Sequence, residues 1–190
     1  PYRWEGNHIQ QRVVNPWTLP LQKPHPRIYI PGAGTRETVE FAARHRYPYI
    51  AMGTGEEKAL IVWEMYNNAA REMGYEAGPP EHGYLLKCHV AETEEKAIEN
   101  AREFYFMTDG FTATFNPDWV SPPGYDPPET RRARLASPPY PAPRFEDELA
   151  RGRLVVGTPG QVVEKLRWLM ERLRPRMLAL SANDFWVFAA

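Results

Sequence analysis

The residues best suited to chemistry lie in one short turn, Gly32-Ala33-Gly34-Thr35, which follows the β-rich run 27–31. Glycines permit tight backbone geometry and close approach of a ligand, and a helix start presents unpaired N–H groups and a positive dipole end. Phosphate is the natural ligand for such a turn, although an ordinary strand-to-helix connection has the same composition. The turn lacks the third glycine of a dinucleotide fingerprint and the lysine of a P-loop, so both of those sites are excluded.

A second turn, Met52-Gly53-Thr54-Gly55, ends the next β-rich run. Ligands of parallel α/β sheets and barrels collect at the carboxyl ends of strands, so this turn is expected to share the cleft of the first. Ser181, Asn183 and Asp184 follow the last predicted strand and belong to the same rim by that logic. The candidate cofactor-binding residues are Gly32, Ala33, Gly34, Thr35, Met52 and Gly53.

Residue types alone assign no catalytic residue and no metal site. The five histidines show no recognisable metal-ligand spacing. Cys88 has only Lys87 as an adjacent cation, which favours a buried, inert thiol. His89 lies beside Cys88 in a predicted strand, so the two side chains are expected on opposite faces of the sheet.

Alternating strands and helices position these residues. Strands are predicted at 27–31, 47–52, 84–90 and 177–182, and helices at 36–46, 56–73, about 94–107 and from Thr158 onward. Thr35 and Thr93 are predicted N-caps, and Thr158-Pro159-Gly160-Gln161 has the pattern of a capping box. The alternation favours a parallel α/β sheet with right-handed crossovers. Four strands cannot close an eight-stranded barrel, so the pattern fits either a doubly wound domain or half a barrel.

Two proline-rich segments interrupt this rhythm. Residues 1–26 show no sustained helical or strand period, and their prolines predict an extended lead-in. Residues 108–152 carry nine prolines between Pro117 and Pro143, and no helix is predicted there before Phe145. Loops of this length in compact domains are usually lids, binding loops or disordered segments, so a lid over the strand ends is expected.

Composition excludes several classes of partner. The 190 residues have a formal net charge of −1 and no basic run, which leaves no electrostatic footprint for nucleic acid or an anionic membrane. No stretch approaches the roughly 18 apolar residues of a membrane span. The single cysteine rules out an internal disulfide and fits a reducing cytoplasm. Pro1 in place of methionine indicates a processed protein or a piece of a longer one.

Three segments resemble the luciferase-like flavin monooxygenase family, in the correct order. Residues 4–53 resemble the lead-in, fifth strand, small-residue turn, helix ending "AARH" and sixth strand of that family. LLKCHVAETEEKAIENA (85–101) is similar to its seventh strand and helix, and VVGTPGQVVEKLRWL (155–169) to the helix before its eighth strand. The resemblance implies a partial (β/α)₈ TIM barrel, strands five to eight, with a proline-rich insertion before the last strand. Residues 1–190 would then be the C-terminal half of the barrel.

The function that this resemblance implies is monooxygenation of a small organic substrate with reduced FMN and oxygen. A separate flavin reductase would supply the reduced FMN, and the turn at Gly32–Thr35 matches the family's phosphate-binding position. The isolated chain is expected to be inactive, because much of the family's flavin and substrate pocket comes from strands one to four. Two alternatives stay open. One is a deazaflavin-dependent oxidoreductase of the same fold. The other is a non-catalytic half-barrel that associates with a complementary chain or with itself.

Overall fold

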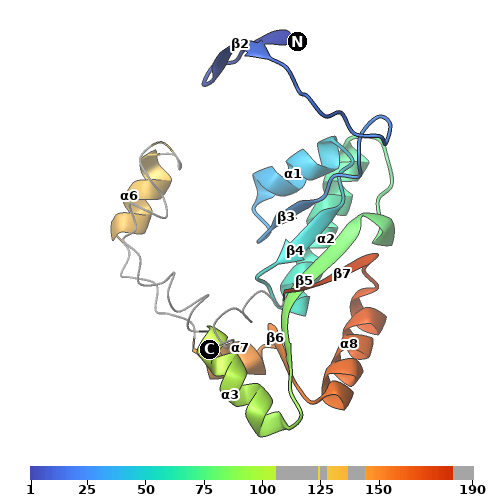
Figure 1. The fold of residues 1–190 in the computed structure, drawn as a ribbon, viewed down its shortest axis with the longest axis vertical. Coiled ribbons are helices and arrows are strands. Elements are labelled where there is room, and N and C mark those ends of the chain that lie inside the picture. The colour runs from blue at the N-terminus through green and yellow to red at the C-terminus, as the bar shows by residue number, and fades with distance from the viewer. Residues whose placement is uncertain (106–123, 125–127, 137–143, 182–190) are drawn as a thin grey trace.

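The computed structural model describes residues 1–105, 124, 128–136 and 144–181, and its centre is a parallel sheet (Figure 1). Strands β3, β4, β5 and β6 lie in that order, and β7 pairs with β5 as well. Their bounds are Ile30–Gly32, Tyr49–Met52, His82–Val90, Leu154–Gly157 and Met177–Ser181. The predicted parallel α/β architecture is confirmed. Strand β6 was not among the predicted strands, since LVVG is too short to show a period.

Strand β5 holds the sheet together, because it pairs with three other strands. Its first half is bonded to β4 on one edge, with Tyr49 opposite His82. Strand β7 pairs with Gly83–Lys87 and β6 with Lys87–Val90, so Lys87 has a partner in each of these two strands. The nine residues of β5 are therefore long enough to pair with three short strands.

The helices cover the sheet according to the alternation of its side chains. Helices α1 (Arg36–Arg44) and α2 (Glu56–Glu72) enclose Tyr49 of β4, and α8 (Pro159–Leu173) closes over Tyr84, Leu86 and Cys88 of β5. Cys88 is buried, as expected, and burial raises the pKa of its thiol. A third cluster lies on the other face of β6, since Leu154 and Val156 pack with α3 (Glu94–Tyr105) and α7 (Phe145–Ala150), whereas Val155 faces α8.

The spacing of apolar residues predicts that Phe41, Leu60, Val163 and Met170 lie on the buried faces of their helices. They are exposed, at 44%, 40%, 45% and 40%. On α2 the predicted positions Trp63 and Tyr66 are buried, and Ala59, Val62, Ala69 and Ala70 complete the buried face. Small residues at several of these positions let α2 lie close to β4 and α1, which turns the larger side chains outward.

The lead-in was predicted as extended chain without strands, and that prediction is wrong for part of it. Strands β1 (Tyr2–Glu5) and β2 (Gln10–Val14) form an antiparallel hairpin that stands apart from the sheet (Figure 1). An irregularity between Tyr2 and Trp4 shifts the register, which hides the alternation that normally reveals a strand.

The segment 108–152 was predicted to hold no helix before Phe145, which is also wrong. Helix α6 spans Pro128–Ala136. Pro128 stands at its first position, where proline is tolerated, and the following ETRRARLA contains good helix formers and no proline. Most of the predicted insertion loop, and with it the expected lid, falls outside the described residues.

The predicted helix caps differ in what their hydroxyls do. Thr158 accepts the backbone N–H of Gln161, whose side chain accepts the N–H of Thr158 at 2.8 Å, so the capping box is confirmed. Thr93 likewise accepts the N–H of Lys96 at 3.2 Å. Thr35 stands at the N-cap position of α1 but caps no N–H, because its hydroxyl donates to the hydroxyl of Thr38 at 2.8 Å. The predicted capping bond of Thr35 is therefore absent.

Thr158→Ala is expected to lower the free energy of unfolding by about 1 kcal/mol, because it removes a working cap. The matched variant Thr35→Ala is expected to change it by only a few tenths of a kcal/mol, since no backbone N–H loses its acceptor. Urea unfolding of the two variants and the parent checks this. Equal losses at the two positions would show that the Thr35 hydroxyl caps α1 in solution.

His82, at the amino end of β5, is a buried structural histidine. Its ring stacks on Trp63 with centroids 4.8 Å apart, and its Nε2 lies 3.0 Å from Oδ1 of Asn67. Burial is the main cause that lowers the pKa of His82 to about 4, against a weaker opposing effect of Glu64. The neutral ring is therefore the form that the folded chain favours.

The depressed pKa of His82 predicts acid sensitivity. Its contribution to stability is complete above the unfolded pKa of 6.5 and is lost as the pH falls toward 4, up to about 3 kcal/mol. The free energy of unfolding, measured between pH 7 and pH 4, should fall by about that amount more in the parent than in His82→Gln. His45→Gln, at an exposed position, controls for the substitution itself, and the acid-dependent loss assigned to His82 should persist in it.

Candidate functional site

The two predicted turns lie together at the carboxyl edge of the sheet. The turn at Gly32–Thr35 leaves β3 and the turn at Met52–Gly53 leaves β4, and these strands are parallel neighbours with Gly32 opposite Ala51. Ala33, Thr35, Met52 and Gly53 are exposed at this edge. The geometry therefore brings the six candidate cofactor-binding residues to one rim, as the strand order requires.

Packing inside the protein accounts for both glycines of the first turn. A Cβ on Gly32 would overlap the hydroxyl of Tyr49, and a Cβ on Gly34 would overlap Val62 of α2. Gly34 also has a φ of 92°, which side chains rarely adopt. Its N–H donates to the Tyr49 hydroxyl at 3.0 Å and is thus occupied. Burial raises the pKa of Tyr49, which keeps that hydroxyl neutral.

The start of α1 is the part of this turn that remains available to an anion. Thr35 gives no side-chain cap, so no side chain of the turn accepts the N–H groups of the first helical turn. Uncapped N–H groups and the positive helix end favour a bound oxyanion. The neighbouring Arg36 is exposed and pairs with Glu40 at 2.6 Å. The backbone N–H groups at the start of α1 are therefore open to an oxyanion, whereas the Thr35 hydroxyl would have to leave Thr38 to donate to one.

The second turn is shaped differently. Gly53 has a φ of 63°, and a Cβ built on it would meet nothing within 4 Å, so backbone conformation alone calls for glycine there. Thr54 is buried, its hydroxyl has no hydrogen-bond partner, and its carbonyl accepts the hydroxyl of Tyr84 at 2.8 Å. Burial is the main cause that raises the pKa of Tyr84 to about 12, so the Tyr84 hydroxyl stays protonated.

The face of β4, β5 and β7 that lies opposite to Tyr84 and Leu86, called the open face below, contributes no side chain to the three core clusters. Its Ile50 and His89 are nevertheless buried, and on the same side of the sheet Leu154 and Val156 of β6 pack with α3 and α7. The register places Met52, Leu85 and Ala179 in one row of that face, with Lys87 and Ser181 in the next row toward the carboxyl edge. Lys87 and Ser181 are half-buried. The predicted rim residue Ser181 thus ends β7 beside Lys87, while Asn183 and Asp184 lie outside the described residues.

Two site residues escaped sequence reasoning. Tyr49 supports the first turn, but an aromatic residue inside a β-rich run gives no local sign of a partner 15 residues earlier. In the sequence, Lys87 stands out only as the cation next to Cys88. The register with Ser181 shows its place on the open face, and register is a property of strand pairing rather than of local sequence.

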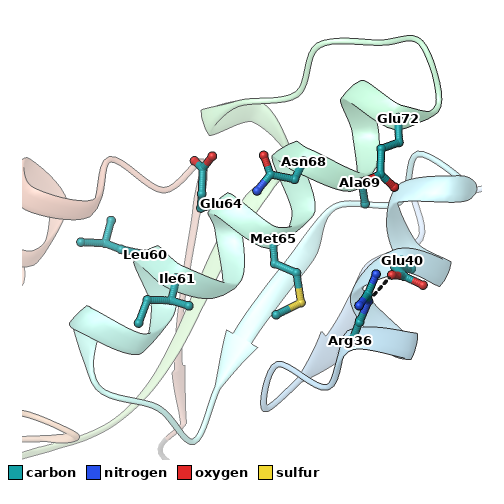
Figure 2. A pocket seen from close by; sticks show the side chains of 9 residues that line it. All are labelled: Arg36, Glu40, Leu60, Ile61, Glu64, Met65, Asn68, Ala69 and Glu72. Carbon is teal, nitrogen blue, oxygen red and sulfur yellow. Dashed lines mark hydrogen bonds and ion pairs between the residues drawn. The ribbon is translucent and has the colours of Figure 1, made fainter.

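A separate groove of about 690 Å³ lies on the outer helical layer between α1 and α2 (Figure 2). Its lining residues are Arg36, Glu40, Leu60, Ile61, Glu64, Met65, Asn68, Ala69 and Glu72. None of the six candidate cofactor-binding residues lines it. The groove is therefore distinct from the strand-end site.

Neither a cluster of metal-ligating side chains nor a membrane-spanning helix occurs in the described part of the chain. No three side chains of the histidine, cysteine, aspartate or glutamate type gather there in a way that could hold a metal ion. None of the helices described is long and apolar enough to span a bilayer.

Known structures share this arrangement of strands and helices. Monooxygenase RslO1 from Streptomyces bottropensis matches with a TM-score of 0.58 at 21% identity, over 95% of this chain and 48% of its own. The FMN-bound oxygenating constituent of 3,6-diketocamphane monooxygenase from Pseudomonas putida matches with a TM-score of 0.59 at 18% identity. This match covers 97% of this chain and 52% of that protein's chain. An F420-dependent secondary alcohol dehydrogenase in complex with an F420-acetone adduct matches with a TM-score of 0.61 at 17% identity. This match covers 95% of this chain and 49% of the dehydrogenase chain.

These likenesses concern the fold, and they extend over about half of each relative's length. The sheet of this chain thus corresponds to part of a barrel. The sequence gives the more specific result, since the family model for luciferase-like monooxygenases matches residues 1–175. The chain belongs to the luciferase-like monooxygenase family.

Proposed function

We propose that residues 1–190 form the C-terminal half of a luciferase-like barrel that acts as an FMN-dependent monooxygenase on a small organic substrate. The strand-end rim carries this proposal, because an uncapped helix start and an open glycine turn meet there, beside the half-buried Lys87 and Ser181. A separate flavin reductase would supply the reduced cofactor. The cytoplasm is the proposed location, since the one cysteine is a buried thiol.

The residues present fit a flavin phosphate at the first turn. The backbone N–H groups at the start of α1 and the hydroxyl of Thr35 would hold the phosphate, while Ala33 and Gly53 leave the approach free of large side chains. The Gly34 N–H takes no part, because it supports Tyr49. Gly32 and Gly34 therefore fix the position of the start of α1, and the backbone N–H groups there would bind the phosphate.

The open face of the sheet supplies the remaining surface. Met52, Leu85 and Ala179 form an apolar floor, and Lys87 brings a cation to the row nearest the rim. Such a face would exclude water from a bound ring system once a complementary half closes the barrel. When bound, reduced flavin supplies the electrons and the reactivity toward oxygen, and the chain's own groups bind and orient it.

A deazaflavin is the second candidate cofactor. The F420-dependent dehydrogenase of the same fold motivates it, because a helix start that binds phosphate serves either cofactor. Oxygen consumption in the presence of reduced FMN separates the two functions, since hydride transfer by a deazaflavin needs no oxygen.

Thr35→Ala tests the phosphate position. With a complementary half-barrel supplied in trans, the variant should bind FMN about 10- to 150-fold more weakly, the range expected when a hydrogen bond to a charged group is lost. Riboflavin, which lacks the phosphate, should bind equally to variant and parent in a fluorescence titration. Thr158→Ala, a capping threonine of another helix, is the control and should leave both affinities unchanged. Equal losses for the two flavins would mean that the turn is only structural.

The isolated chain is expected to show no FMN-dependent oxygenation, whereas the chain joined to a complementary four-stranded half should be active. Half of the barrel leaves the flavin ring without walls on one side, which exposes it to water. Oxygen consumption with reduced FMN and a panel of small organic substrates measures this. Turnover by the 190 residues alone would contradict the half-barrel assignment while leaving flavin chemistry in place.

A further inference from the structure

The first 24 residues expose an unusual amount of apolar surface. Trp17 and Leu21 are 90% and 95% exposed, and Tyr2, Trp4, Ile9, Val13 and Leu19 are each more than half exposed. The register of the β1–β2 hairpin places Tyr2 and Val14 opposite each other on one face, with Trp4 next to them. So many exposed apolar side chains within one segment favour a contact site over a surface adapted to water.

This segment, residues 1–24, is here called the arm. None of its residues belongs to the core clusters of the described chain, and it extends away from the sheet (Figure 1). The chain first engages the body at His25, whose ring meets Tyr47 edge-on at 6.2 Å, and at Arg27, which donates to the carbonyl of Pro80 at 3.1 Å. An isolated two-stranded hairpin is marginally stable in water, so the arm needs a surface to pack on.

The groove between α1 and α2 has the matching properties. Leu60 and Ile61 are 40% and 64% exposed along it, and the side chain of Met65 lies between the two helices (Figure 2). Glu64 and Glu72 stand along the α2 side. The groove thus joins an apolar strip to an acidic border.

The charges of the arm and the groove are opposite in sign. The groove lining contains one arginine and three glutamates, and Arg71 pairs with Glu64 of this lining at 2.9 Å, so the groove with Arg71 has a formal side-chain charge of −1. The arm contains Arg3, Arg12 and Lys23 against Glu5, a formal charge of +2. Complementary charge orients two apolar surfaces toward each other and suppresses other pairings.

We propose that the arm of one copy of this chain packs into the α1–α2 groove of a second copy, and that two copies exchange arms reciprocally. The three aromatic side chains of an arm expose about two-thirds of roughly 150–250 Å² each, so two arms and the two grooves that they cover would bury on the order of 1,200–2,000 Å². That is the size of a standard specific interface. Exchange of identical segments is an economical route to a symmetric dimer.

Helix α6 is the competing basic segment, with Arg131, Arg132 and Arg134 in PETRRARLA. Its only large apolar residue is Leu135, which leaves little to fill the strip at Leu60 and Ile61. The arm offers both the charge and the apolar side chains, so it is the occupant that the groove favours.

Sedimentation velocity over a range of chain concentrations tests the exchange. The parent should form a dimer, and both Trp17→Ser/Leu21→Ser in the arm and Ile61→Lys in the groove should weaken it at least about 30-fold. All three side chains are exposed in the single chain, so folding should be unaffected. Val163→Ser, at a 45% exposed position on α8, is the control and should dimerise like the parent.

Mixing the arm variant with the groove variant gives the decisive measurement. Neither variant should dimerise alone, but the mixture should form a heterodimer, because one intact arm then meets one intact groove. A monomeric parent, or a dimer that withstands either variant, would overturn the proposal. So would a dimer broken by serine at the three arginines of α6 and not by the arm variant. Protection of the arm in a one-to-one complex with a complementary half-barrel, without dimerisation, would equally overturn it.

Discussion

The structure depends on the register of β5 with its three partner strands. Because side chains alternate along a strand, the pairing of Gly83 with Ile50 and with Met177 decides which residues face the helices and which face the open side. Tyr84 and Leu86 are thereby committed to the core beneath α8, and Leu85 and Lys87 to the opposite face. A slip of one residue would exchange the two sets and remove the core.

Close contacts at glycine keep this sheet and its helices at the distances that the site requires. Gly83 lies against Ile50, with room for no larger residue, and Gly32 and Gly34 lie against Tyr49 and Val62. The conformation of the turn at Gly32–Thr35 is therefore set by packing within the protein. What it leaves to a ligand is the start of α1, held at the rim by the bond between Gly34 and the Tyr49 hydroxyl.

The stabilising contacts, the α1–α2 groove and the candidate site lie in different parts of the structure. The amino end of β5 is stabilised by the stacked pair of His82 and Trp63, far along the strand from the rim where the two turns meet. The outer helical layer carries the α1–α2 groove, and the open face carries Lys87 beside Ser181. This division is typical of barrels, in which the amino face serves stability and the carboxyl face serves chemistry.

Neighbouring residues sufficed to predict the order of β3, β4, β5 and β7 with helices α1, α2, α3 and α8, the caps at Thr93 and Thr158, and the family to which the chain belongs. The sequence also placed the six candidate site residues at one edge, because parallel neighbours must end together. The tertiary structure alone decided three features: the hairpin of β1 and β2, the extra strand β6, and the open face that Lys87 shares with Ser181. It likewise turned the Thr35 hydroxyl to Thr38 and gave Gly34 its partner. These features arise from contacts between segments distant in the sequence, or from a choice between nearby hydrogen-bond partners. Packing in the folded chain decides these contacts and these choices, so local residue patterns do not predict them.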